Sequence, residues 1–148
     1  MIMFFTSCGE GKKQTLEMPG DSGTDSTLPA AETAAVISDS EIEEGKALYT
    51  AHCLVCHQVT GGGVPGLNPP LKGTEYVIGP KARLVGILLN GSNKGLEIEG
   101  VSYANAMPGF AMLSDAELAL VATYVRNSFG NSAGPVTESE VAEIRAER

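Results

Sequence analysis

Apolar positions recur at helical spacing in four segments of the chain, three of which open with a capping box. The first capping box, of the form S-x-x-E, covers residues 38–41, and its acidic residues suit the positive end of a helix. Ile42, Gly45 and Tyr49 follow on one helical face. This pattern predicts a helix over residues 38–51.

Two further helices are predicted in the second half of the chain. Residues 83–89 are mostly apolar and precede Asn90-Gly91, a pair that ends helices. Residues 114–117 form the second capping box, and the helix that follows is expected to end near residues 129–130. Its inward face is predicted to carry four apolar residues: Leu118, Val121, Ala122 and Val125.

The last predicted helix is short. Residues 137–140 form its capping box, and Val141 and Ile144 form its apolar face. No segment of the chain shows convincing strand alternation. The loops between helices are rich in Gly and Pro, as in residues 61–63 and 68–70. We therefore expect an all-α fold with long loops and no internal repeat.

Residues 1–37 lack the pattern of a folded domain. Met1–Phe5 is apolar, and Thr6-Ser7-Cys8-Gly9 resembles the end of a bacterial lipoprotein signal, although the apolar stretch is short and no basic region precedes it. Residues 9–37 have few large apolar residues, which predicts a flexible linker. We interpret residues 1–37 as a truncated export or lipoprotein signal and linker, with Cys8 as the lipidation site. An incidental free thiol is the alternative.

The composition limits both the core and the class of partner. Four Phe, four Tyr and no Trp leave the core short of large aromatic side chains. The formal net charge is −8, which argues against nucleic-acid binding because a basic patch is its usual signature. No stretch after the N-terminus approaches the ~20 apolar residues that a membrane-spanning helix needs.

Residues Cys53-Leu54-Val55-Cys56-His57 form the motif C-x-x-C-H, which is the attachment signal for c-type haem. Two thiols at this spacing can bond to the two vinyl groups along one porphyrin edge, and His57 can offer its imidazole to the iron. A zinc site usually needs a second pair of ligands, and a thioredoxin-like dithiol needs a βαβ context; neither is present in the sequence. A plain Cys53–Cys56 disulfide remains possible.

Residues 38–130 resemble a class I cytochrome c beyond the haem motif. In that family a Gly and an aromatic precede the first haem Cys by eight and four residues, as Gly45 and Tyr49 do here, and Tyr124 occupies the position of an aromatic on the last helix. A Pro and a Leu follow the axial His, here Pro69 and Leu71. The resemblance implies a small all-α fold wrapped around one covalent haem c, with residues 131–148 as a C-terminal extension that contains a short helix.

The resemblance also implies a set of haem contacts. Met107, in a Met-Pro pair before the last helix of the domain, corresponds to the second iron ligand, and the Pro69 carbonyl is expected to hold the His57 imidazole. Met112 is interpreted as a core residue and His52 as a surface or packing residue. Candidates for the haem propionates are Tyr76 and Arg83, with a solvated Arg83 as the alternative. Candidate wall residues are Val64, Leu71, Ile87, Leu88, Leu113 and Val121.

Iron held by His57 and Met107 has no vacant position for a substrate, which favours one-electron transfer over catalysis. We therefore expect an exported monohaem cytochrome that is not an enzyme, tethered at the periplasmic face of a bacterial membrane. Its expected partners are a donor dehydrogenase or quinol-oxidising complex and an acceptor oxidase or reductase. The alternatives are a dedicated subunit of a dehydrogenase or copper enzyme, and a catalytic or sensory haem protein with an open iron site.

Overall fold

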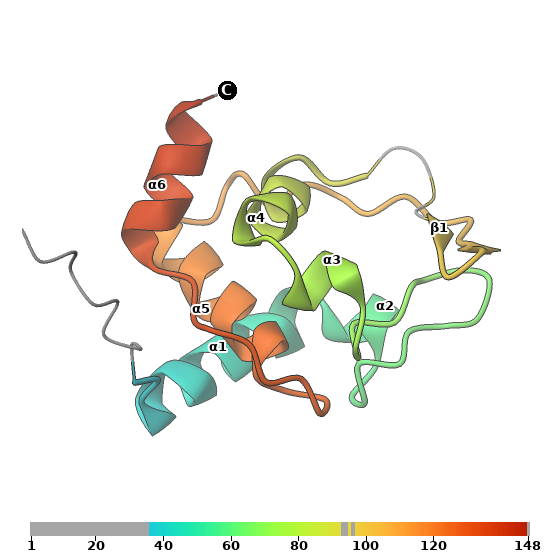
Figure 1. Cartoon of the computed structure of the whole chain (residues 1–148), viewed down its shortest axis with the longest axis horizontal. Coiled ribbons are helices and arrows are strands. Elements are labelled where there is room, and N and C mark those ends of the chain that lie inside the picture. Colours follow the sequence, from blue (N-terminus) through green and yellow to red (C-terminus); the bar gives the residue numbers. More distant parts are fainter. Residues whose placement is uncertain (1–35, 93–94, 96, 148) are drawn as a thin grey trace, which may run out of the picture. The chain divides into compact units, whose positions relative to one another are not determined.

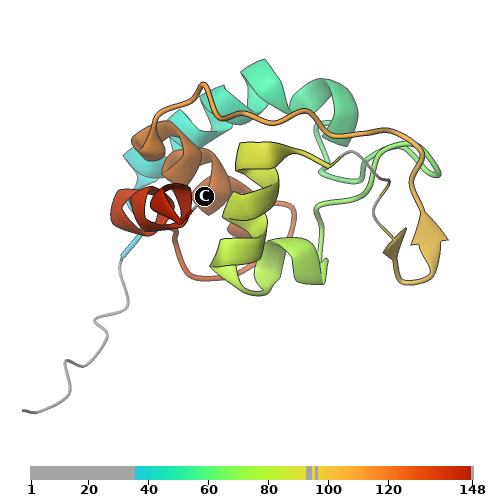
Figure 2. The same ribbon diagram turned by 90° about the horizontal axis from the view of Figure 1, so that it is seen from above.

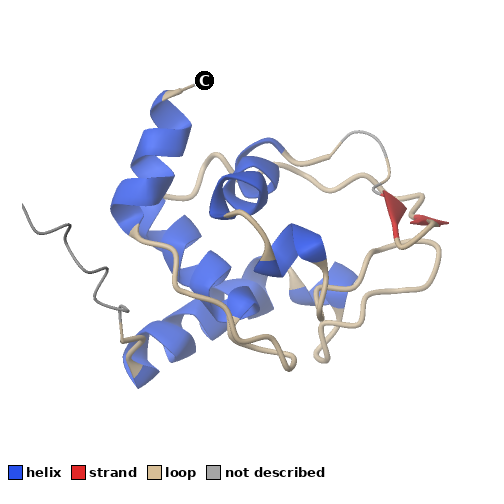
Figure 3. Cartoon of the chain, viewed as in Figure 1, coloured by secondary structure: helices blue, strands red, loops and turns tan. Residues whose placement is uncertain are grey.

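The computed structural model describes residues 36–92, 95 and 97–147 of the chain. These residues form mainly helices and loops, with one small two-stranded sheet (Figure 3). The helices are α1 (Asp39–His52), α2 (Leu54–His57), α3 (Glu75–Ile78), α4 (Lys81–Asn90), α5 (Asp115–Arg126) and α6 (Glu138–Ala146). The strands are β1 (Glu97–Ile98) and β2 (Val101–Ser102). The predicted all-α class is confirmed, whereas Cys8 and nearly all of the predicted linker lie outside the described residues.

The three predicted capping boxes are all formed. At α1, the Ser38 hydroxyl accepts from the Glu41 amide at 3.3 Å, and the Ser38 amide donates to the Glu41 carboxylate at 2.8 Å. Ser114 and Thr137 cap α5 and α6 by the same reciprocal bonds. Because these bonds join residues only three apart, the sequence alone is sufficient to predict them.

Helix α5 ends at Arg126, a few residues before the predicted end. Asn127 leaves the helical conformation, and Phe129 adopts a left-handed backbone with φ of 60°. The Phe129 ring then packs against Gly61, where a Cβ would overlap it. Residues 127–130 therefore leave the helix and pack against a distant loop, a contact that the sequence of α5 does not indicate.

The sequence does not predict α2, α3 or the β1–β2 hairpin. Each of the two helices is a single turn, and the strands pair only Glu97 with Ser102 and Ile98 with Val101. The hairpin turns at Glu99 and Gly100, both with positive φ, as a type I′ turn requires. Elements this short contain too few residues for a hydrophobic period to appear.

Helices α1 and α5 pack together around Gly45 (Figure 1). A Cβ on Gly45 would overlap the Leu120 carbonyl oxygen and lie 2.7 Å from the Tyr124 Cβ, so the two backbones meet there directly. Tyr49 lies next to this crossing, with its ring centroid 5.4 Å from that of Tyr124 and 5.3 Å from that of Phe129. Three of the eight aromatic residues of the chain therefore fill the same part of the core.

Helix α6 packs on α4 and α5, so packing is continuous across residue 130 (Figures 1 and 2). Val141 of α6 is fully buried. The Lys81 ammonium lies 2.6 Å from the Glu140 carboxylate, and the Arg145 guanidinium lies 2.6 Å from that of Asp115. The division at residue 130 stays a prediction about the extent of the cytochrome domain.

Two buried polar side chains at the end of α5 hold neighbouring loops in place. The Arg126 guanidinium donates to the carbonyls of Val77, Gly79 and Gly134 at 2.6, 2.9 and 2.8 Å. The Asn131 amide donates to the Leu71 carbonyl at 3.1 Å and accepts from the Gly73 amide at 2.7 Å. These bonds fix the segment from Leu71 to Gly79 against α5.

Among the described residues, no helix has both the length and the apolar character that crossing a membrane requires.

Candidate functional site

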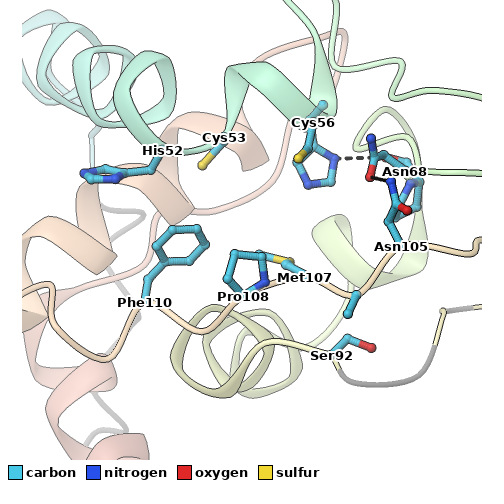
Figure 4. Close-up of a pocket in the computed structure, with 12 residues that line it drawn as sticks. His52, Cys53, Cys56, Asn68, Ser92, Asn105, Met107, Pro108 and Phe110 are labelled. Atoms are coloured by element: carbon cyan, nitrogen blue, oxygen red, sulfur yellow. Dashed lines mark hydrogen bonds between the residues drawn. The ribbon is translucent and has the colours of Figure 1, made fainter.

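The two motif cysteines lie on one helical turn at the junction of α1 and α2. Cys53 ends α1 and begins α2, and its carbonyl accepts from the amides of Cys56 and His57 at 3.1 and 2.9 Å. Both are free thiols, with Cys53 buried and Cys56 exposed. Burial and the neighbouring Cys56 raise the pKa of Cys53 to about 11. This single turn presents both sulfur atoms along one wall of a cavity (Figure 4).

The His57 imidazole is buried and held in one orientation by the loop that follows. Its Nδ1 lies 2.9 Å from the Pro69 carbonyl oxygen. A carbonyl can only accept, so Nδ1 carries the hydrogen and the lone pair of the neutral ring is on Nε2. Burial lowers the pKa of His57, and the bond to Pro69 opposes this effect only in part. The imidazole is therefore neutral near pH 7 and has a donor nitrogen available for a metal.

The Pro69 loop is itself tightly constrained. The Gly63 amide donates to the His57 carbonyl at 3.1 Å, and the Leu71 amide donates to the Gly61 carbonyl at 2.7 Å. A Cβ on Gly63 would lie 2.5 Å from the Pro69 carbonyl oxygen, the atom that orients the imidazole. Only a glycine leaves room for that carbonyl, and its φ of 63° suits a glycine as well.

Met107 lies across the cavity from the cysteines (Figure 4). Its backbone exchanges two hydrogen bonds with Ser92, at 2.8 and 3.0 Å. A Cβ on Gly91 would overlap the Met107 carbonyl, so the loop after α4 approaches the Met107 loop closely. The segment with Met107 is thereby held against the end of α4.

The loops that carry Pro69 and Met107 also touch each other. The Asn105 side-chain amide donates to the Asn68 side-chain oxygen at 3.0 Å (Figure 4). The amides of Ala104 and Asn105 donate to the carbonyls of Gly66 and Leu67, both at 3.0 Å. We call these three hydrogen bonds the loop clasp.

The cavity has an outer and an inner part, which share Cys53, His57, Pro69 and Met107. The outer part is further lined by His52, Cys56, Asn68, Asn105, Pro108 and Phe110, among others. The inner part is mostly apolar and includes Leu71, Thr74, Tyr76, Ile87, Leu88 and Val121.

Of the other residues predicted to contact the haem, some line the cavity and others lie away from it. Tyr76 lines the inner part, but Arg83 does not: its guanidinium stacks over the Tyr76 ring, 5.5 Å from the centroid, and lies 3.7 Å from the Glu75 carboxylate. Of the predicted wall residues, Val64 and Leu113 are not among the lining residues. Exposed His52 lies at the rim, where its ring contacts Phe110 edge-on at 5.8 Å.

The prediction for Met112 is wrong. Its side chain is 76 % exposed, so it does not fill the core. It lies in the turn before α5, where the neighbouring Phe110 and Leu113 pack against the core instead. The apolar composition of this segment does not indicate which of its residues are exposed to solvent in the turn.

Sequence reasoning also missed several cavity residues. Leu84 and Val125 belong to predicted helices, and Val125 was expected to face inward, but neither was predicted to line the cavity. Ile98 lies in the unpredicted hairpin, and Thr74 lies in a segment with no recognisable pattern. No local signal identified either one.

The residues around the cavity fit a haem by their chemistry. Two thiols lie on one turn, a neutral imidazole has a donor nitrogen available, and a thioether lies across the cavity from the cysteines. The inner walls are apolar and suit a porphyrin. The fold and the cavity together define a c-type cytochrome.

Comparison with known proteins agrees with this class. Residues 42–129 match the family model of cytochrome c, so the chain belongs to the cytochrome c family. Cytochrome c-552 of Thermus thermophilus is 34 % identical over 114 residues, covering 71 % of this chain and 86 % of that protein.

Cytochrome subunits of dehydrogenases are also similar to the chain. The cytochrome c subunit of an alcohol dehydrogenase (quinone) from Gluconacetobacter polyoxogenes is 34 % identical, over 84 % of this chain and 26 % of that subunit. The fructose dehydrogenase cytochrome subunit of Gluconobacter japonicus is 32 % identical, over 70 % of this chain and 22 % of that subunit. The chain thus spans about a quarter of the length of these dehydrogenase subunits.

Membership of this family defines the general role of the chain. Its cofactor is covalently bound haem c, and its single C-x-x-C-H motif corresponds to one haem. It is an electron-transfer protein and not itself a catalyst, and its partners are redox proteins. Proteins of this family are typically exported.

Proposed function

We propose that the chain is a membrane-tethered carrier of single electrons, with haem bonded to Cys53 and Cys56 and its iron held by His57 and Met107. The observation that carries the proposal is the orientation of His57 by Pro69 in a cavity that Met107 also lines. An imidazole with one fixed tautomer and a thioether across the same cavity form the donor pair of an electron-transfer haem.

Haem c supplies a one-electron Fe(III)/Fe(II) couple. His57 and Met107 would hold the haem iron, and with both ligands in place no position on the iron would be open to a substrate. The Pro69 carbonyl keeps the imidazole in its donor orientation, and the loop clasp together with the Ser92 bonds keeps the Met107 segment in place. Leu71, Ile87, Leu88 and Val121 exclude water from the inner cavity.

Optical spectroscopy of the ferric holoprotein tests the proposed ligands. The wild-type chain is expected to show a sulfur-to-ferric charge-transfer band that Met107→Ala abolishes. Met112→Ala is the matched control, because this exposed Met lies away from the cavity and its loss should leave the band unchanged. A wild-type spectrum of high-spin ferric iron that binds small ligands readily would instead support a catalytic or sensory haem protein.

A second candidate is the dedicated electron-accepting subunit of one enzyme. The similarity to dehydrogenase cytochrome subunits over as much as 84 % of this chain favours it. Purification from native membranes distinguishes the two functions. Co-purification with a dehydrogenase in fixed stoichiometry supports the subunit, whereas an isolated cytochrome that exchanges electrons with several diffusing proteins supports the carrier.

For localisation, we propose the periplasmic face of a bacterial membrane, with the chain anchored by acylated Cys8. The motif Thr6-Ser7-Cys8-Gly9 supports this proposal. Mass spectrometry of the mature protein should find acyl chains on Cys8. Cys8→Ala should move the protein from the membrane to the soluble fraction without changing its haem content. A mature wild-type chain with an unmodified Cys8 thiol would contradict the anchor.

A donor dehydrogenase or quinol-oxidising complex and an acceptor oxidase or reductase are the proposed partners. The net charge of −8 suits partners with a basic or largely apolar docking face. Reduction of the holoprotein by such a donor should slow as ionic strength rises if basic residues guide docking, because salt screens charge attraction. A rate independent of salt would indicate an apolar docking face.

A further inference from the structure

We infer that the hydroxyl of Thr74 donates a hydrogen bond to a propionate of the haem. The inference rests on haem c as the cofactor and deepens the proposed site by naming a contact that neither the motif nor the family resemblance assigns.

Thr74 is buried, and its hydroxyl has no hydrogen-bond partner in the part of the chain that the structure describes. The residue is 6 % exposed, and among the described residues its Oγ1 is the buried side-chain oxygen or nitrogen that lacks a hydrogen bond. A buried hydroxyl without a partner destabilises a fold, and such groups in native proteins usually meet a partner in a bound ligand or water. None of the described residues supplies this partner, which points to a bound group that meets the hydroxyl.

The local backbone does not use this hydroxyl. Thr74 precedes α3, and its carbonyl accepts from the amides of Val77 and Ile78 at 2.9 and 3.0 Å, but its side chain makes no capping bond. Ser38, Ser114 and Thr137, at the starts of α1, α5 and α6, all use their hydroxyls as caps. The role of the Thr74 side chain is therefore not explained by the helix that it precedes.

Thr74 lines the inner part of the cavity, where its neighbours are mostly apolar. Leu71, Val77, Leu84 and Ile98 line the same part and have no side-chain group that could accept a hydrogen bond. A porphyrin that fills this space is itself apolar over most of its surface. Its two propionates are its charged hydrogen-bond acceptors, so a propionate is the group that would satisfy the hydroxyl.

The surroundings of Thr74 suit a carboxylate. Tyr76 lines the same part of the cavity and carries a second hydroxyl. The Arg83 guanidinium stacks over the Tyr76 ring outside the cavity, where the Glu75 carboxylate 3.7 Å away offsets part of its positive charge. Tyr76 and Arg83 remain the propionate contacts predicted from the sequence. Thr74 adds a buried donor, which contributes more than an exposed one because water competes less for its partner.

The test compares Thr74→Val with Thr74→Ser in the full-length holoprotein. Val keeps the shape and removes the hydroxyl, whereas Ser keeps the hydroxyl. Thr74→Val should shift the propionate bending band in the resonance Raman spectrum. It should also move the propionate-linked step in the pH dependence of the reduction potential up by about one pH unit, because an ionised propionate loses a donor. Thr74→Ser should restore both signals.

Thr50→Val is the matched control, because the Thr50 hydroxyl bonds only to the Lys46 carbonyl within α1 and lies away from the cavity. The inference is overturned if Thr74→Val leaves the propionate band and the pH step unchanged, or if it raises the melting temperature, as removal of an unpaired hydroxyl would. The sulfur-to-ferric band, recorded on the same samples, keeps this outcome separate from a failure of the proposed ligands.

Discussion

Gly45 lies at the crossing of α1 and α5, where a Cβ would overlap the Leu120 carbonyl oxygen. Gly45→Ala gains up to about 1 kcal/mol of helix propensity but forces the two backbones apart, which costs about 1–3 kcal/mol. We expect a net loss in the free energy of unfolding, measured by chemical denaturation of the holoprotein. The family resemblance assigned a glycine to this position, and the structure shows the close approach that requires it.

Gly134→Ala provides the control for that substitution. Nothing lies within 4 Å of the Cβ that it would add, and the φ of Gly134 is not in the left-handed region. Its stability should stay the same or rise slightly, since Ala restricts the unfolded chain. Equal changes in the free energy of unfolding for Gly45→Ala and Gly134→Ala would show that α1 and α5 can move apart without loss of stability.

At the scale of elements, the loop clasp joins two segments that are 37 residues apart in sequence. Asn105→Ala removes the side-chain bond to Asn68 and loosens the segment that carries Met107. An exposed hydrogen bond worth about 0.5–1.5 kcal/mol changes an opening equilibrium roughly 2- to 10-fold. We therefore expect ferric Asn105→Ala to bind imidazole more tightly by a factor in that range, as measured by optical titration.

Asn127→Ala is a suitable comparison for the loop clasp. The Asn127 side chain, just after α5, donates to the Thr123 carbonyl of that helix at 2.8 Å and does not line the cavity. Its imidazole affinity should match that of the wild-type protein. An unchanged affinity in Asn105→Ala would mean that the Ser92 bonds alone hold the Met107 segment.

The contact between α4 and α6 should weaken in acid. Burial raises the pKa of Glu140, but the Lys81 and Thr137 interactions together outweigh it and hold the pKa below its ordinary 4.5. The unfolded chain therefore takes up the proton first as the pH falls. The contribution of Glu140 is complete above about pH 4.5 and is lost as the pH drops through its lowered pKa.

Glu140→Gln measures this contribution, because Gln can keep the capping box while it removes the charge. At pH 7 the variant should be less stable by up to about 1 kcal/mol, the usual range for a partly exposed ion pair. The difference from the wild-type protein should shrink as the pH falls below about 4.5 and through the lowered pKa of Glu140. Lys81→Met should remove the same difference, and a stability difference that does not change with pH would rule out the ion pair as its source.

Some features of the helices and turns depend on residues close together in sequence, and others depend on contacts between distant residues. The capped starts of α1, α5 and α6 follow from residues three apart and were predicted correctly. The end of α5 was predicted a few residues too late, because the sequence does not indicate that Phe129 leaves the helix and packs against Gly61. The exposure of Met112 likewise depends on how its turn packs, and the prediction from its apolar character was wrong.

At the scale of the whole molecule, part of the core lines a cavity whose apolar walls suit the cofactor. Leu84, Leu88, Val121 and Val125 face the inner part and would lose their packing partner in a haem-free chain. We expect the double variant Cys53→Ser/Cys56→Ser, made without haem, to lose about 3 kcal/mol or more of stability and part of its helical circular dichroism. Cys8→Ser should keep both. A haem-free chain that melts like the holoprotein would contradict this dependence on the cofactor.

The sequence by itself determined the four main helices, three of their caps, the family and the C-x-x-C-H turn, because each depends on residues near one another in the chain or on fixed spacings. Only the tertiary structure decided that Asn68 meets Asn105, that Arg126 and Asn131 fix the loop beside α3, and that Thr74 is buried at the cavity. The physical reason is that these polar groups find their partners, or lack them, only after the helices pack and bring distant loops together.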